Sequence, residues 1–309
     1  KHPADMDIAV YLSYMYMATG QTPKAVDLLE GLSKKIEGPE RLKVDVALAE
    51  ALHQNRETSQ AIDKIEELYI RYPGAEEPLL AHIRILKSTY KWQQLAEVIT
   101  RWYEKHPDKS FAVLAVTSQI IDYSQPASVN CAELVLRQIC QQDYQNAEAL
   151  NSLAILLHIT GRSSEALKCY EKVLMLDPDR IVALNNMAWI LCEEQQQYEQ
   201  ALQLAQKGLR KNPDYADLID TRGVAYYRLG EYKKSIADFL KCIQLYTNVS
   251  SAAAGAHFHI ARSYEKIGRD SDAMKHLETA MELNRTNGGL SSEDLAQVNK
   301  IMSRISERN

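Results

Sequence analysis

Apolar residues recur at helical spacing, in pairs of segments, along nearly the whole chain. The clearest pair spans residues 147–180, with the sequence AEALNSLAILLHITGRSSEALKCYEKVLMLDPDR. Leu150, Leu153 and Leu157 fall on one stripe of a first helix. A second helix ends before Pro178, because proline cannot continue a helix. Neither helix can bury its stripe alone, so the pattern predicts that the two helices pack against each other.

The pair repeats. One residue near the start of each second helix, small in seven of eight cases, marks the period: Ala25, Ala61, Leu95, Ala132, Ala166, Ala201, Ser235 and Ala273. The steps between these residues run from 34 to 38 residues. The prolines that close second helices keep the same step: Pro73, Pro107, Pro178 and Pro213. Two independent markers in register predict eight helix pairs.

The combined pattern is W/L-x2-L-A/G-x2-Y/L, then Gly, then A-x3-Y/F, then Pro, and it is complete in residues 147–180. On these residues the chain resembles the tetratricopeptide repeat (TPR) family, whose unit of about 34 residues has this arrangement. The resemblance implies an all-α fold: a right-handed alpha-alpha superhelix of about eight helix-turn-helix repeats with a C-terminal capping helix.

The markers divide the chain into three parts. Units one to four occupy residues 1–146, units five to eight occupy residues 147–287, and the capping helix occupies residues 288–309. The third and fourth units are irregular. The third has Leu95 in place of the small residue and His82 at an apolar position.

The fourth unit carries about three extra residues in the turn-rich stretch 124–130, which is predicted to bulge between its helices. After the eighth unit, residues Ser291 to Asp294 are typical of a helix N-cap. A narrow apolar stripe follows, as a capping helix that faces water on its other side requires: Leu295, Val298, Met302 and Ile305.

Composition and net charge limit the classes of partner that the chain can bind. The chain of 309 residues is 46% hydrophobic and 25% charged, with a net charge of −5. We therefore expect no nucleic-acid partner, and no apolar stretch is long enough for membrane insertion. The five cysteines include no CxxC pair, and their odd number makes a closed disulfide framework unexpected. Free cysteines slightly favour a cytoplasmic location, and a periplasmic one fits if a targeting segment was removed, so the compartment stays open.

No motif of a catalytic, metal or cofactor site is found in the sequence. His257 and His259 lie two positions apart, so on a helix they point in different directions and cannot share a metal ion. We therefore expect no enzymatic activity, no cofactor and no metal.

The resemblance also implies a binding surface, because the first helices of successive repeats line a concave wall. Carried over position by position, the predicted peptide-binding residues are Asn151, Asn185, Trp189, Asp220, Tyr227, Phe258 and Arg262. Amides can pair with both groups of a peptide backbone, and aromatic rings can cover its apolar side chains. Alternatively, Trp189 and Tyr227 are partly buried between helices. The acidic Asp217 and Asp220 favour a partner of basic character.

These features predict a non-catalytic scaffold that binds a protein or an extended peptide in the assembly of a larger complex. Units five to eight resemble repeats of bacterial envelope and secretion-associated proteins. One alternative is a regulatory or substrate-recognition arm of an enzyme whose catalytic domain lies outside this sequence. Another is self-association through Tyr11, Tyr14, Met15 and Tyr16. The oligomeric state is not predicted.

Overall fold

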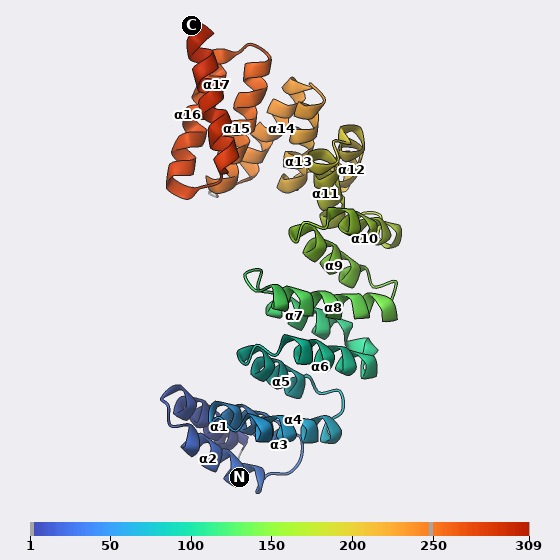
Figure 1. Ribbon diagram of the computed structural model, residues 1–309, viewed down its shortest axis with the longest axis vertical. Coiled ribbons are helices and arrows are strands. Elements are labelled where there is room, and N and C mark those ends of the chain that lie inside the picture. Colours follow the sequence, from blue (N-terminus) through green and yellow to red (C-terminus); the bar gives the residue numbers. More distant parts are fainter. Residues whose placement is uncertain (1–2, 247–249, 309) are drawn as a thin grey trace. The chain divides into compact units, whose positions relative to one another are not determined.

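The computed structural model describes residues 3–246 and 250–308 (Figure 1). That part of the chain is built from 17 α-helices and contains no strand, which confirms the predicted all-α fold. The chain divides into two compact units, residues 1–149 and 150–309.

The first unit contains eight α-helices and the start of a ninth. They are α1 (Pro3–Ala18), α2 (Thr22–Ser33), α3 (Glu40–Gln54), α4 (Thr58–Arg71), α5 (Glu76–Ser88), α6 (Trp92–Lys105), α7 (Ser110–Ile120) and α8 (Pro126–Gln142). A short 3-10 turn, η1 (Pro107–Lys109), precedes α7. Each odd-numbered helix packs on the helix that follows it, and α1, α3, α5 and α7 lie side by side in turn.

The second unit continues the same order. Its helices are α9 (Ala147–Ile159), which starts at the boundary, α10 (Ser163–Leu176), α11 (Ile181–Trp189), α12 (Tyr198–Lys211), α13 (Ala216–Arg228), α14 (Tyr232–Leu245), α15 (Ser250–Lys266), α16 (Asp270–Asn287) and α17 (Ser292–Arg308). Here α11 packs on α12, α13 on α14 and α15 on α16, and the helices α11, α13, α15 and α17 contact one another in turn.

The residues that mark the period in the sequence all lie in the core of the structure. All eight, from Ala25 to Ala273, are completely buried, at 0% exposure. Leu95 is among them, so the irregular third unit packs its larger side chain in the same place. Small side chains at these points let two helices approach until their larger neighbours interlock. The predicted helix-pair repeat is therefore confirmed.

His82, at an apolar position of the third unit, is accommodated by burial as a neutral ring. It is 4% exposed and lies on α5 with its Nδ1 3.4 Å from the hydroxyl of Tyr69. Burial lowers the pKa of His82 to about 4. The ring is therefore uncharged at neutral pH and behaves as part of the core.

The fourth unit has a shorter bulge than predicted. Helix α8 begins at Pro126, so most of the stretch 124–130 is helical. Proline suits the first turn of a helix, where its missing N–H is not needed. The hydroxyl of Ser128 donates to the carbonyl of Ile120 at 2.6 Å and accepts from the N–H of Asp122 at 2.8 Å. The extra residues thus lengthen α8, and only the turn 121–125 separates the two helices.

The sixth unit is one residue longer than the fifth between equivalent positions, and the extra residue is absorbed by a π-helical turn. This turn, η2 (Ile190–Glu194), directly follows Trp189. A π-turn takes one residue more than an α-turn to close its hydrogen bonds, so it fits an insertion without breaking the helix.

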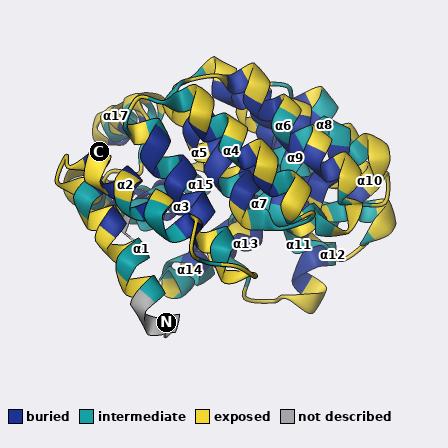
Figure 2. Ribbon diagram, turned by 90° about the horizontal axis from the view of Figure 1, so that it is seen from below, coloured by how far each residue is buried: buried dark blue, intermediate teal, exposed yellow. Residues whose placement is uncertain are grey.

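Helix α17 caps the array as predicted, with one change in its buried face. The Ser291 hydroxyl accepts from the N–H of Asp294 at 3.1 Å, and the Asp294 carboxylate accepts from the N–H of Ser291 at 3.0 Å, a reciprocal cap. Val298, Ile301 and Ile305 are buried, whereas Leu295 and Met302 are only partly covered. Figure 2 shows α17 with both buried and exposed residues, as expected of a cap that faces solvent.

Candidate functional site

The candidate site lies along the first helices of the second unit. Of the predicted residues, Asn151 lies on α9, Asn185 and Trp189 on α11, Asp220 and Tyr227 on α13, and Phe258 and Arg262 on α15. Their exposure differs: Asn151 and Phe258 are buried, and the other five are partly exposed.

The amide of Asn185 is engaged within the protein. Its Oδ1 accepts a hydrogen bond of 2.9 Å from the hydroxyl of Thr221 on α13. Its Nδ2 lies 3.5 Å from the Oδ1 of Asn186, whose own Nδ2 donates to the hydroxyl of Tyr170 at 2.9 Å. These bonds tie α11 to α13 and to α10. Asn185 therefore serves first to connect neighbouring helices.

Asn151 and Trp189 are also turned partly inward. Asn151 is 8% exposed, and its Oδ1 is a buried acceptor with no donor among the described residues. Trp189 is half-buried and packs against the hydrophobic core of the sixth and seventh units. Packing between helices, the alternative for Trp189, agrees with this position.

Phe258 is not on the exposed wall where the sequence pattern places it. Its ring is 1% exposed and packs with Ala261, Leu277 and Val298. The reason is the capping helix: α17 lays Val298 and its buried neighbours over this part of α15. Phe258 therefore cannot contact a partner directly.

The side chain of Asp220 is less negatively charged than an ordinary aspartate at neutral pH. Burial, together with the negative charge of the nearby Asp217, raises the pKa of Asp220 to about 7. At neutral pH its carboxyl is therefore partly protonated. The negative charge of the Asp217–Asp220 pair, which in the sequence favours a basic partner, is therefore reduced. Asp217 is the exposed member of the pair.

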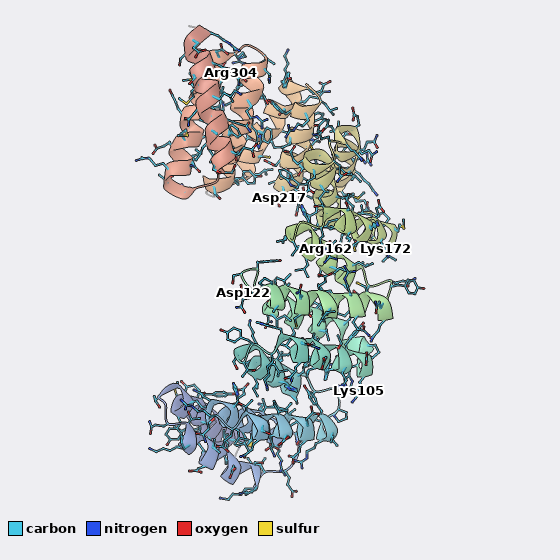
Figure 3. All side chains as sticks on the ribbon, in the orientation of Figure 1. Lys105, Asp122, Arg162, Lys172, Asp217 and Arg304 are labelled. Atoms are coloured by element: carbon cyan, nitrogen blue, oxygen red, sulfur yellow. The ribbon has the colours of Figure 1, made fainter. Side chains whose placement is uncertain are left out.

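Beside Tyr227 and Arg262 the structure forms a basic hollow of about 330 Å³, here called the α15–α17 pocket. Its lining residues are Tyr227 from α13, Arg262, Glu265 and Lys266 from α15, and Gln297, Lys300, Ile301 and Arg304 from α17. Figure 3 labels Arg304 on the capping helix. Four cationic side chains meet one carboxylate here, in a chain whose net charge is −5.

Arg262 is held in the wall of this pocket by aromatic rings. Its guanidinium carbon lies 4.4 Å from the centroid of the Tyr227 ring and 5.4 Å from that of Phe258. Such cation–π contacts fix the plane of the group. Its Nη1 lies 3.5 Å from Nδ1 of His259, and its other N–H groups are available to a ligand. Burial, followed by the charge of Arg262, lowers the pKa of the adjacent His259 to about 4, so this imidazole stays neutral.

The only carboxylate of the α15–α17 pocket is neutralised by one of its cations. Glu265 is buried, and its Oε1 lies 3.0 Å from Nη2 of Arg304. The Nε of Arg304 is buried without a hydrogen-bond partner in the part of the chain that the structure describes. Lys266 and Lys300 are exposed, and within the described ranges neither makes an ion pair. The pocket thus retains a positive charge suited to an anionic group.

Sequence reasoning missed the contribution of α17 to this pocket. Lys300 and Arg304 lie four positions apart, so they share one face of the helix. In the sequence this face is part of the polar side of a capping helix, and only the packing of α17 on α15 brings it to Arg262. The four-residue spacing of Lys300 and Arg304 could have indicated a shared basic face. Whether that face borders a pocket depends on which side of α17 packs on α15.

In the first unit, the residues of the predicted self-association surface are unequally exposed. Tyr11, Tyr14 and Met15 on α1 are 67%, 42% and 46% exposed, whereas Tyr16 is half-buried against the core. The hydroxyl of Tyr14 donates to Glu50 on α3 at 3.1 Å.

The described residues contain no cluster of three or more side chains suited to a metal ion. Among those residues, no helix combines the length and the apolar character needed to cross a membrane.

Family models of the tetratricopeptide repeat match residues 147–180, 216–248 and 256–291. The chain therefore contains tetratricopeptide repeats. The matched stretches coincide with the fifth, seventh and eighth helix pairs, and the last two contribute Tyr227 and Arg262 to the α15–α17 pocket. Repeats of this kind support a protein-interaction scaffold.

A search of curated proteins finds no match. Among solved structures, this chain is similar to several structures of MamA. MamA 41-end from Desulfovibrio magneticus RS-1 is 23% identical, with a TM-score of 0.47 over 52% of this chain and 87% of that one. A crystal structure of MamA protein is 22% identical, with a TM-score of 0.46 over 56% and 92% of the two chains. MamA AMB-1 is 26% identical, with a TM-score of 0.46 over 51% and 90%.

Proposed function

We propose that this chain is a non-catalytic scaffold that binds an extended peptide along the first helices of its second unit, with a carboxylate of the peptide in the α15–α17 pocket. The observation that carries the proposal is the set of cations around the pocket: Arg262, Lys266, Lys300 and Arg304. Only Arg304 has a carboxylate partner within the pocket. An acidic residue would complete the charge balance.

The geometry of Arg262 and Tyr227 supports a specific contact. An arginine already stacked on a ring loses little conformational freedom when it binds a carboxylate. The exposed part of Tyr227 offers apolar area beside the charge, an arrangement common at the centre of peptide-binding surfaces. We therefore propose an acidic partner. The sequence alone favours a basic partner, because of Asp217 and Asp220.

Selection from a random displayed peptide library tests this function. The full chain is immobilised, and the same library is selected in parallel on the double variant Arg262→Met/Lys300→Met. We expect enrichment of aspartate and glutamate on the unchanged chain, lost on the double variant. Enriched peptides no more acidic than the starting library, or the same peptides on both proteins, would contradict the proposal.

We further propose that the scaffold acts in a bacterial envelope or secretion-associated assembly, because units five to eight resemble repeats of such proteins. The sequence of the full-length gene tests this, since an export signal or a lipoprotein signal would support it. A flanking catalytic domain would favour the enzyme-arm alternative instead.

A further inference from the structure

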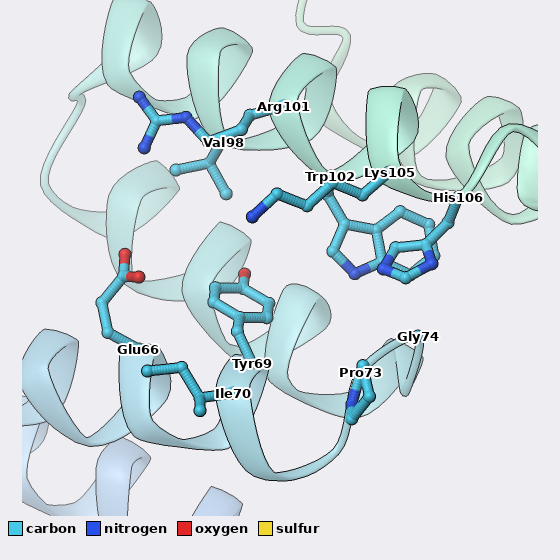
Figure 4. Close-up of a pocket in the computed structure, with 10 residues that line it drawn as sticks. All are labelled: Glu66, Tyr69, Ile70, Pro73, Gly74, Val98, Arg101, Trp102, Lys105 and His106. Atoms are coloured by element: carbon cyan, nitrogen blue, oxygen red, sulfur yellow. The ribbon is translucent and has the colours of Figure 1, made fainter.

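A second pocket lies in the first unit, between the second helices α4 and α6. Its volume is about 340 Å³, within the range of small ligand sites. Figure 4 shows the residues that line it: Glu66, Tyr69, Ile70, Pro73, Gly74, Val98, Arg101, Trp102, Lys105 and His106. We call it the α4–α6 pocket. None of these residues belongs to the first helices that carry the proposed peptide groove.

The floor of the α4–α6 pocket is apolar and partly open. Trp102 is 5% exposed, and its ring is inclined at 49° to that of His106, with 4.9 Å between ring centroids. At the rim, by contrast, Ile70 is 84% exposed, the most exposed of the large hydrophobic side chains in the described ranges. An exposed isoleucine next to a ready-made aromatic floor is the arrangement that receives an apolar side chain of a partner.

The same tryptophan, Trp102, carries a buried hydrogen-bond donor, its indole Nε1, that has no acceptor in the described part of the chain. Figure 4 shows the nitrogen edge of the indole turned toward the turn at Pro73 and Gly74. Buried N–H groups in native proteins nearly always have a partner. A backbone carbonyl of a bound peptide, entering beside Pro73, would supply one.

The charged side chains of the α4–α6 pocket indicate what kind of peptide it would bind. Arg101 and Lys105 on α6 are both exposed and line the pocket, and in the described part of the chain neither makes an ion pair. One carboxylate, Glu66, lies on the opposite helix, α4. The α6 side therefore favours an anionic residue next to the apolar one.

We propose that the α4–α6 pocket is a second binding site, which takes a short peptide segment with an apolar or aromatic anchor residue directly beside an acidic residue. The anchor lies on Tyr69, Ile70 and Trp102. The neighbouring carboxylate faces Arg101 and Lys105, and a peptide carbonyl accepts from the Trp102 indole.

The chain's three tryptophans make this site directly observable. In a ¹H–¹⁵N spectrum of the full chain, the indole signal of Trp102 is assigned by its loss in Trp102→Phe. The probe is the peptide Gly-Ser-Phe-Asp-Gly-Ser with acetylated and amidated ends. Two matched peptides carry alanine in place of phenylalanine or lysine in place of aspartate.

We expect the Trp102 signal to shift and saturate with the probe, about five-fold or more tighter than with either matched peptide. The signal of Trp92, which lines neither pocket, should stay in place. No shift of the Trp102 signal, or equal shifts with all three peptides, would overturn the proposal.

Variants locate the contact. Ile70→Ser and the double variant Arg101→Glu/Lys105→Glu should each weaken binding of the probe peptide. Phe111→Ser, at an 82% exposed position of the same unit, should leave its affinity unchanged. An equal effect of Phe111→Ser would overturn the site. Arg262→Met should leave the shift of the Trp102 signal by the probe unchanged. A failure of the peptide site proposed for the second unit can therefore be told apart from a failure of the α4–α6 pocket.

Discussion

The guanidinium of Arg262 lies on the ring of Tyr227, with 4.4 Å between its central carbon and the ring centroid. The two residues come from the first helices of consecutive repeats, α13 and α15. Their contact therefore depends on the repeat spacing and connects the fold to the proposed site. It also orients the only arginine of the α15–α17 pocket that has no carboxylate partner there.

The ion pair between Glu265 and Arg304 should matter for the stability of the C-terminal end. Arg304→Met leaves the buried carboxylate of Glu265 without a partner, and we expect a loss of about 2 kcal/mol in the local free energy of opening. Hydrogen exchange of the amides in α15 and α17 measures it. Glu265→Gln added to Arg304→Met should restore most of the loss.

Arg308→Met is the matched control. Arg308 is on the same helix, and its Nη1 lies 3.4 Å from Asp270 in an exposed pair, worth about 0.5 kcal/mol or less. Equal effects of the Arg304 and Arg308 substitutions would show that the burial of Glu265 is unimportant.

Asp220 should make the second unit less stable as pH rises. Its pKa in the folded chain, about 7, is above the ordinary value of 3.8, so between these values the folded state holds a proton that the unfolded state has released. Stability then falls by roughly 1 kcal/mol per pH unit over that window. Hydrogen exchange in α13, compared between Asp220→Asn and the unchanged chain, should show this loss removed by the substitution.

Asp217→Asn offers a second check, because the Asp217 charge contributes to the raised pKa. The carboxyl of Asp220, followed by ¹³C NMR, should titrate at lower pH in this variant. A midpoint that does not move would leave burial as the sole cause.

His82 should have the opposite pH dependence in the first unit. Its pKa of about 4 lies below the ordinary 6.5, so the unfolded state gains the proton first as pH falls. The stability that the neutral ring contributes is present above pH 6.5 and is lost as pH falls toward 4. His82→Leu should remove this acid sensitivity, measured as hydrogen exchange in α5 of the full chain at pH 7 and pH 5. Equal acid sensitivity in both proteins would contradict the burial argument.

The helix pairs could be predicted from the sequence because one buried residue, small in seven of the eight repeats, recurs at the start of each second helix. The same reasoning failed at Phe258, since its burial depends on where α17 settles and not on its own repeat position. Lys300 and Arg304 were missed for a related reason: a polar helix face looks the same in sequence whether it meets water or borders a pocket. Side chains at the junction of a repeat and its cap are therefore the hardest to assign.

The most direct test of the central claim is the affinity of the full chain for an acidic peptide taken from the library selection. Fluorescence anisotropy gives the dissociation constant for the unchanged chain, for Arg262→Met, and for the control Lys172→Met, which removes an exposed cation of α10 outside the pocket. We predict a loss in affinity of about ten-fold or more for Arg262→Met, with no change for Lys172→Met. Equal affinity for all three proteins would contradict it.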